Sequence, residues 1–276
     1  MTALLEVGAG VGWPDIDAAA VARRTPTRPG RFAELVEWLA GVQGRFPPER
    51  PDRVRAFVLG PLGRPVAELA ERYDIGLRSG DLDADATKAF AQGVDAADRE
   101  IDEGAELLVL AARDDTSAPN VLISVLTDAE PVALLPRGAE AVDSERWVAA
   151  AEELRDGRRE VAELRSRPDE LLAALGSPLI AASAGFALRA AARRTAVVLD
   201  GNAVLAAALL CVDSHPRARE WWQLADSSPD RAAARVRDRL ERQPLLALSA
   251  GNGDGTAGLL AVEILRAAMI TGVIDG

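Results

Sequence analysis

Three short apolar segments lie between stretches with helical periodicity, and this alternation constrains the fold more than any other feature of the sequence. The segments are residues 54–59, 107–110 and 197–199, each bounded by polar or glycine-containing turns. Short apolar runs of this kind are typical of strands buried on both faces. Strands that alternate with helices predict an α/β fold, with a parallel sheet flanked by helices on both sides.

Apolar residues at helical spacing predict helices along much of the remaining chain. The predicted helices are 31–42, 65–73, 83–103, 144–164, 169–175, 180–193, 203–212, 230–240 and 259–269. The run 121–126 fits either a helix or a strand, 132–135 is a candidate strand, and the first thirty residues are rich in turn formers. Helices dominate both ends, so we expect one domain over residues 1–276, with a small helical lobe formed by about 1–50 and 215–245.

Charge and hydropathy exclude several classes of partner. The chain has 32 Lys and Arg against 43 Asp and Glu, a formal net charge of −11. This acidity argues against nucleic acid or an anionic membrane surface as a partner. The most apolar stretch, 171–192, is interrupted by Gly176, Pro178 and Arg189, which indicates a buried helix rather than a membrane span. Because the N-terminus has no signal-peptide pattern, the expected location is the cytoplasm.

The chain has a single cysteine, Cys211, and a single histidine, His215. One cysteine permits neither an intrachain disulfide nor a cysteine-based zinc site. One histidine, expected to be exposed in a loop between helices, excludes most catalytic triads and histidine metal clusters. Any chemistry is therefore expected to use carboxylates, hydroxyls, arginines and backbone groups.

Residues 251–258 (GNGDGTAG) form the segment richest in glycine, and they precede a predicted helix. Four glycines in eight residues let the backbone approach a ligand closely. Free N–H groups at the start of the helix are suited to an anion or a polar ligand edge. Asp254 stands between two glycines, where its carboxylate can be held close to a substrate. The alternative is an ordinary helix entry in which Asp254 or Thr256 is the cap.

Two polar segments directly follow predicted strands. Asp200, Gly201 and Asn202 follow one strand, and residues 113–117 (RDDTS) follow another. Because ligands of open parallel sheets bind beyond the carboxyl ends of the strands, both segments are candidates for ligand contact. The alternatives are a strand-to-helix turn capped by Asp200 or Asn202, and a solvated loop at 113–117.

Several segments match the motifs of one family, in the same order along the chain. They are 29–32 (PGRF) with 38–44 (WLAGVQG), 93–95 (GVD) through 103–109 (EGAELLV), 171–176 (LLAALG), 190–194 (AAARR) with 197–201 (VVLDG), and 244–248 (PLLAL) followed by 253–256 (GDGT). Together they resemble the nicotinate-nucleotide:dimethylbenzimidazole phosphoribosyltransferases. The resemblance covers nearly the whole chain.

This resemblance implies a Rossmann-like parallel α/β domain with a small helical lobe, usually in a homodimer. It also implies transfer of phosphoribose from nicotinate mononucleotide to 5,6-dimethylbenzimidazole, which makes the lower-ligand nucleotide of cobalamin without a metal or another cofactor. The family's general base is the glutamate of a GEGTG motif, and Asp254 stands at the matching position. The residues expected to bind substrate are Asp200, Gly201, Asn202, Asn252, Gly253, Gly255, Thr256, Arg113, Thr116 and Ser117.

The sequence departs from the family where polar groups would hold substrate. Residues 60–65 (GPLGRP) replace a GDHGV motif, and the region after them is shorter. Residues 113–119 replace a glycine-rich GIGNTT phosphate loop, and their two aspartates oppose a phosphate unless Arg113 compensates. Residues 176–179 lack the acid of a GGFE motif, and 226–232 lack the histidines and glutamate of SHxSAExGH.

Two hypotheses follow from this combination of likeness and departure. The first is a phosphoribosyltransferase that acts on a small-molecule nucleotide and an aromatic base, with Asp254 as the base. The second is a non-catalytic relative, a binding, regulatory or partner subunit that pairs with an active family member.

Overall fold

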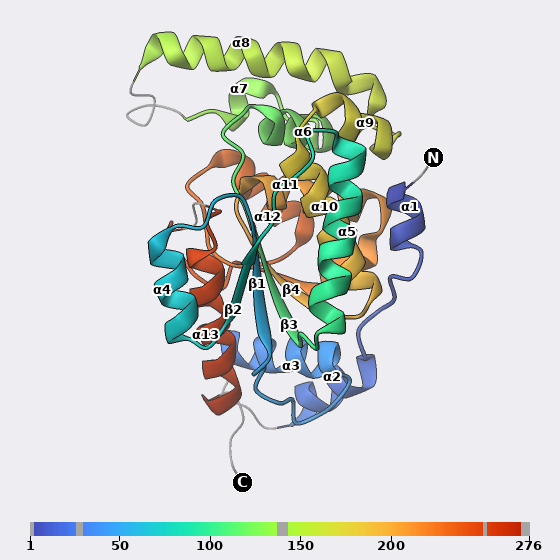
Figure 1. Cartoon of the computed structure of the whole chain (residues 1–276), viewed down its shortest axis with the longest axis vertical. Helices are drawn as coiled ribbons and strands as arrows, with labels where there is room; N and C mark the ends of the chain where they lie inside the picture. Colours follow the sequence, from blue (N-terminus) through green and yellow to red (C-terminus); the bar gives the residue numbers. More distant parts are fainter. Residues whose placement is uncertain (1–2, 26–29, 137–142, 251–252, 272–276) are drawn as a thin grey trace.

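The computed structural model describes residues 3–25, 30–136, 143–250 and 253–271, and it contains a five-stranded parallel sheet (Figure 1). The strands lie in the order β2-β1-β3-β4-β5. Their bounds are β1 Val54–Leu59, β2 Gly76–Ser79, β3 Leu107–Ala112, β4 Ala196–Asp200 and β5 Trp222–Leu224. The α/β fold with a parallel sheet flanked by helices is thus confirmed.

Strand β3 lies at the centre of the sheet, and each of its six residues is buried. Val109 pairs with Ala56 of β1 on one side and with Val198 of β4 on the other. Side chains alternate between the faces of a strand, so Val109 enters one apolar core and Leu110 the other. A continuous apolar run is what a strand covered on both faces requires.

Thirteen helices are formed by the described residues, and some of them cover the two faces of the sheet. They are α1 Ala3–Gly8, α2 Ile16–Arg24, α3 Arg31–Gln43, α4 Arg64–Arg72, α5 Ala86–Asp102, α6 Ala118–Thr127, α7 Pro131–Leu134, α8 Ser144–Val161, α9 Pro168–Leu175, α10 Pro178–Ala192, α11 Asn202–Ser214, α12 Arg231–Leu240 and α13 Thr256–Thr271, with short 3-10 turns at Ala162–Leu164 and Pro216–Trp221. Helices α3, α4 and α13 share one core with the sheet, and α5, α10 and α11 share the other.

Helices α5 and α10 pack with their backbones in close contact. A Cβ at Gly93 would lie 2.0 Å from the carbonyl oxygen of Ala182, and a Cβ at Gly185 would lie 2.2 Å from that of Phe90. The glycines and the small residues of α10 allow this close packing. Helix α10 in turn packs against β3 and β4.

Several local predictions were wrong. Residues 132–135 were a candidate strand, but Pro131–Leu134 forms the short helix α7, because Pro131 favours a first helical turn. The first thirty residues contain helices α1 and α2 as well as turns. Strands β2 and β5 were not expected, because each is short and lies at an edge of the sheet. The ambiguous run 121–126 is part of helix α6.

His215 is half-buried rather than exposed, contrary to expectation. A Cβ at Gly8 would lie 2.4 Å from its Nε2 atom, so helix α1 lies directly on the imidazole ring. Its Nδ1 atom is buried without a hydrogen-bond partner among the described residues. Burial lowers the pKa of this histidine.

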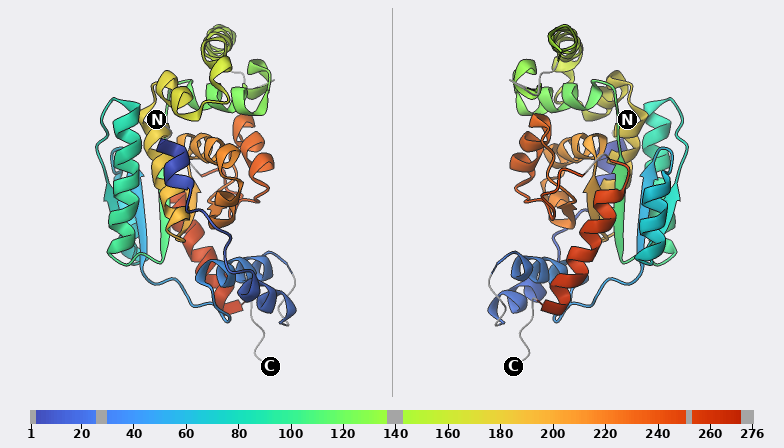
Figure 2. Two further views of the ribbon diagram at one scale, coloured as in Figure 1. Left: turned by 90° about the vertical axis from the view of Figure 1, so that its right-hand side faces the viewer. Right: turned by 90° about the vertical axis from the view of Figure 1, so that its left-hand side faces the viewer.

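The two segments predicted to form a helical lobe make contact through α3 (Figure 2). Trp38 Nε1 donates to the carbonyl oxygen of Glu220 at 2.8 Å, and Arg31 donates to that of Gln243 at 2.8 Å. Helix α1 packs instead against α10 and α9. A single domain with a lobe therefore stays a prediction. None of the helices within the described ranges is long and apolar enough to cross a membrane.

Candidate functional site

The carboxyl ends of β1, β3 and β4 meet at one edge of the sheet, where the glycine-rich segment before α13 covers them. The strand order changes direction at β1, and the crevice between β1 and β3 is where sheets of this order bind ligands. A Cβ at Gly255 would lie 3.2 Å from Val58 of β1 and 3.7 Å from Ala111 of β3. The predicted glycine loop therefore lies over this crevice.

Gly201 brings the loop after β4 against the loop after β3. Its φ is +98°, and a Cβ there would lie 2.1 Å from the carbonyl oxygen of Ala112 and 2.6 Å from Gly253. Any side chain would collide with both backbones. Gly201 and Gly253 were predicted to bind ligand. The structure shows that they let the segments after β3, after β4 and before α13 come into contact.

Asp200 is the buried carboxylate at this junction, with 2% of its surface exposed. It accepts a hydrogen bond from the backbone N–H of Gly258 at 3.1 Å. Burial, and then the nearby charges of Asp254 and Asp226, raise the pKa of Asp200 to about 6. Asp200 therefore fixes the start of helix α13, and it titrates close to neutral pH.

Asp254 is half-buried, and its Oδ1 atom accepts the backbone N–H of Thr256 at 2.9 Å. This is the capping contact that the sequence left open as an alternative. Together with Asp200, it occupies N–H groups at the first turn of α13. Because the N–H groups of Thr256 and Gly258 donate to protein carboxylates, they are not available to an anionic ligand.

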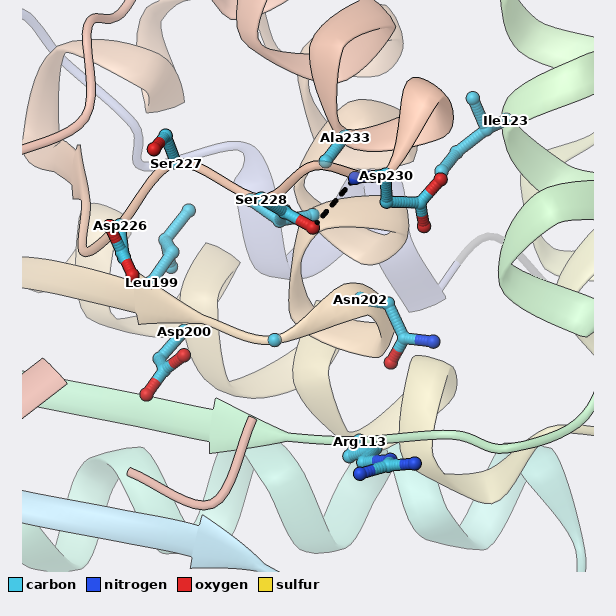
Figure 3. A pocket seen from close by; sticks show the side chains of 12 residues that line it. Arg113, Ile123, Leu199, Asp200, Asn202, Asp226, Ser227, Ser228, Asp230 and Ala233 are labelled. Carbon is cyan, nitrogen blue, oxygen red and sulfur yellow. Dashed lines mark hydrogen bonds between the residues drawn. The ribbon is translucent and has the colours of Figure 1, made fainter. Parts of the chain in front are cut away.

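A cavity of about 310 Å³ opens beside Asp200, between the end of β4 and the start of α12 (Figure 3). Four of its lining residues were predicted to bind substrate: Arg113, Asp200, Gly201 and Asn202. The remaining lining residues are Ile123, Leu199, Leu205, Asp226, Ser227, Ser228, Asp230 and Ala233. The lining combines polar and apolar side chains, as in sites that hold small organic molecules.

The segment 226–232 was matched to a family motif whose histidines and glutamate it lacks, so Ser227, Ser228 and Asp230 were not predicted to bind substrate, yet all three line the cavity. The segment follows the three-residue strand β5, so it occupies another carboxyl end of the sheet. Recognising β5 would have identified the segment by the same rule that found Asp200. Asp230 caps α12 through Ala232 N at 2.9 Å, and burial raises its pKa.

Asp226 connects this segment to the residues before the glycine loop. Its carboxylate accepts the backbone N–H of Leu248 at 2.8 Å and of Ala250 at 2.5 Å. In addition, Ser227 N donates to the carbonyl oxygen of Leu246 at 2.9 Å. The wall of the cavity and the approach to Asp254 are therefore one hydrogen-bonded unit.

Asn202 uses its side-chain amide within the protein. Its Nδ2 donates to the carbonyl oxygen of Asp114 at 2.7 Å, and its Oδ1 accepts the N–H of Asp114 at 2.9 Å and of Ala203 at 2.8 Å. Asn202 thus joins the loop after β4 to the loop after β3. The N-cap of α11 is Gly201, which makes no side-chain capping bond, so the alternative that Asn202 caps this helix was wrong.

The loop after β3 is also held by the side chain of Asp114, of which 5% is exposed. This carboxylate accepts Thr116 N at 2.9 Å, Thr116 Oγ1 at 2.6 Å and Ser177 Oγ at 2.5 Å. The carboxylate of Asp115 is exposed and pairs with Arg113 at 2.7 Å. Only one of the two aspartates therefore presents its charge at the surface.

The Asp114–Ser177 contact joins two segments in which the sequence departs from the family motifs, 113–119 and 176–179. Thr116 directs its hydroxyl to Asp114, whereas Ser117 precedes helix α6 without a side-chain capping bond. Neither Thr116 nor Ser117 lines the cavity of Figure 3. Asn252 lies outside the described residues. Within the described ranges, no group of three His, Cys, Asp or Glu side chains is placed to hold a metal ion.

Comparison with known proteins identifies relatives over most of the chain. The phosphoribosyltransferase family model named DBI_PRT matches residues 82–272. A nicotinate-nucleotide–dimethylbenzimidazole phosphoribosyltransferase of Mycobacterium avium is 31% identical, with 93% of this chain and 92% of the relative aligned. One of Mycobacterium leprae is 30% identical, with 93% and 91% aligned. Each alignment spans 321 positions, more than the 276 residues of this chain, so the relatives contain segments that it lacks.

Solved structures show the same fold. A crystal structure of CobT from Thermus thermophilus superposes with a TM-score of 0.75 at 24% identity, over 96% of this chain and 95% of that one. A nicotinate-nucleotide–dimethylbenzimidazole phosphoribosyltransferase structure from the same organism gives a TM-score of 0.72 at 25% identity, over 96% and 94%. The chain belongs to the nicotinate-nucleotide–dimethylbenzimidazole phosphoribosyltransferase family.

Proposed function

We propose that this protein transfers phosphoribose from nicotinate mononucleotide to dimethylbenzimidazole or a related aromatic base, as a step in making the lower-ligand nucleotide of cobalamin. The observation that carries the proposal is the match to phosphoribosyltransferases along 93% of the chain. The cavity at the carboxyl ends of the strands supports it, because its volume of about 310 Å³ suits part of a nucleotide.

In the proposed reaction a ring nitrogen of the azole attacks C1′ of the ribose. The bond from C1′ to the pyridine nitrogen breaks, and nicotinate leaves with the electron pair. The azole N–H proton passes to the carboxylate of Asp254, whose Oδ1 already accepts Thr256 N at 2.9 Å. This contact fixes the carboxylate at the start of α13, close to Asp200, which lines the cavity.

The transition state of this transfer carries positive charge on the ribose ring. Asp200 and Asp226 line the cavity, and both Asp226 and Asp254 lie close enough to Asp200 to raise its pKa. Fixed carboxylates beside a developing cation lower the barrier without reorganisation. In this proposal Asp200 and Asp226 supply negative potential, while Asp254 accepts the proton.

The test is an assay of nicotinate release from nicotinate mononucleotide and dimethylbenzimidazole, with three proteins compared. We expect turnover by the wild type, a loss on the order of a hundredfold or more in Asp254→Asn, and no change in Asp238→Asn, an exposed aspartate of α12. Undiminished turnover of Asp254→Asn would remove the proposed base. A wild-type protein that neither releases nicotinate nor binds the donor would instead support a non-catalytic binding or partner subunit.

We also propose a cytoplasmic homodimer as the working form, because the family resemblance implies one. Sedimentation of the purified protein tests the oligomeric state, and fractionation of cells tests the location. A monomer in solution at micromolar concentration would contradict the first part.

A further inference from the structure

The cavity beside β4 has an uneven distribution of charge. Asp200, Asp226 and Asp230 contribute three carboxyl groups, and Arg113 is the one basic side chain among its lining residues. A phosphate group repels carboxylates and attracts a guanidinium. Within this cavity the anionic end of a nucleotide therefore belongs on the side of Arg113.

The position of Arg113 depends on a loop without glycines, and the buried carboxylate of Asp114 determines the path of that loop. Three donors converge on this carboxylate, from Thr116 N, Thr116 Oγ1 and Ser177 Oγ, at 2.5–2.9 Å. Ser177 begins helix α10, where its Oγ also accepts Ile180 N at 3.2 Å. The loop is therefore fixed to the helical layer behind the sheet.

The backbone of Asp114 is fixed from the opposite side by Asn202, which lines the cavity. Both polar atoms of the Asn202 amide contact it, at 2.7 and 2.9 Å. The N–H, the carbonyl and the carboxylate of Asp114 are therefore all hydrogen-bonded. Such a residue leaves its neighbour little freedom.

Asp115 acts in the opposite sense to Asp114. Its carboxylate pairs with Arg113 at 2.7 Å, and both side chains are more than half exposed. An exposed pair of this kind is weak, so a phosphate can replace the carboxylate of Asp115. Asp114 therefore helps to position the guanidinium of Arg113, whereas Asp115 competes with a phosphate for it.

We propose that Asp114 is a positioning residue for recognition of the donor's phosphate: it holds Arg113 toward the cavity, while Asp115 competes for Arg113. This inference rests on the proposed function, since it assigns the phosphate of that donor to the Arg113 side of the cavity. Ser177 and Asn202 act through Asp114, and none of the three needs to touch the substrate.

The experiment compares two donors that differ only in the phosphate. Dissociation constants for nicotinate mononucleotide and nicotinate riboside are measured by calorimetry in the wild type, Asp114→Asn, Ser177→Ala and Asp115→Asn. Asp114→Asn should weaken mononucleotide binding about tenfold, because a charge-assisted bond is lost. Ser177→Ala removes the same bond from its other end and should act in the same direction. Asp115→Asn should strengthen mononucleotide binding, by up to about fivefold.

Binding of the riboside should change little in all three variants, because it has no phosphate to recognise. Equal weakening of both donors in Asp114→Asn would show a structural role only and would overturn the proposal, as would unchanged mononucleotide binding. A wild type that binds the two donors equally well, or neither, would also overturn it. Binding of the mononucleotide without turnover would contradict the proposed function alone, so the two failures are distinguishable.

Discussion

Two loops at the same edge of the sheet are held in place by different means. The segment 253–255 before α13 approaches β1 and β3 because Gly253 and Gly255 have positive φ and no Cβ. The loop after β3 has no glycine, and Asp114 fixes it through its carboxylate instead. The first loop relies on the absence of side chains, and the second relies on the hydrogen bonds of one buried side chain.

This difference teaches how each loop should respond to substitution. A side chain added to a glycine loop collides with neighbouring atoms, and the collision is not relieved when those atoms belong to the backbone. A substitution in a loop held by hydrogen bonds leaves buried polar groups without partners. The resulting loss of stability is smaller, and it depends on the hydrogen-bonding groups of the new side chain. Substitutions in the two loops should therefore differ in the size of their effects.

The largest effect is expected for Gly201→Ala, at the contact between the two loops. The added Cβ would lie 2.1 Å from the carbonyl oxygen of Ala112, at a φ of +98°. We expect a loss of about 3 kcal/mol or more in the free energy of unfolding, measured with denaturant. Gly176→Ala is the control, since Gly176 has a φ of +61° but no atom within 4 Å of the added Cβ, and it should lose about 1 kcal/mol. Equal losses would show that strain, not collision, limits these sites.

The second prediction concerns the pH dependence that Asp200 gives to the start of α13. Burial, Asp254 and Asp226 raise its pKa from the ordinary value of 3.8 to about 6 in the folded chain. The folded state therefore binds this proton more tightly than the unfolded state. The contribution of Asp200 to stability is greatest below about pH 4 and declines as the pH rises to about 6, by about 3 kcal/mol in total.

Asp200→Asn removes this titration, so the difference in unfolding free energy between variant and wild type should shift in favour of the variant from pH 4 to pH 7. Denaturant titrations of both proteins across that range measure the shift. Parallel pH profiles would mean that Asp200 titrates in the folded chain as it does in the unfolded one.

A smaller effect is expected for Asn202→Ala, which tests the loop held by hydrogen bonds. The N–H and the carbonyl of Asp114 would lose their partner, at a cost of about 1–3 kcal/mol. Asn202→Asp retains an acceptor for the N–H but has no donor for the carbonyl, so it should also destabilise the fold. Thermal and denaturant unfolding check both variants, and a stable Asn202→Asp would show that the donated bond is dispensable.

The smallest effect on stability is expected for Arg113→Gln. Its pair with Asp115 is exposed, and pairs of this kind contribute below about 1 kcal/mol. The same substitution should weaken donor binding clearly, because it removes the cation from the cavity. A melting temperature and a donor dissociation constant from one preparation separate the two effects. A large loss of stability with unchanged donor binding would reverse the roles given to this arginine.

The sequence predicted the central strands and most helices because those elements carry their signal locally. β3 is an uninterrupted apolar run, and α5 begins at the capping residue Asp85, whose carboxylate accepts Lys88 N. Strand β5 has only three residues and includes Gln223, so its pattern is too short to recognise. For the same reason Ser227 and Ser228, which follow β5, were not predicted to line the site.

At the site, the sequence identified which loops matter and was less informative about what each side chain does. Asp200 and Arg113 were expected at the cavity, and both line it. Asp114 was expected to face a phosphate, but it is buried against Thr116 and Ser177. Ser177 lies sixty-three positions away along the chain, so no local pattern could indicate this contact.

The sequence by itself determined the alternation of strands and helices, the family, and the glycines that precede α13. Each of these depends on short-range periodicity, on residue type or on the order of motifs, all of which are present in the linear chain. Only the tertiary structure decided that Asp200 is buried among other carboxyl groups and that Asp114 joins two distant segments. The charge state and direction of a carboxylate depend on what surrounds it in space, and folding brings those surroundings together from separate parts of the chain.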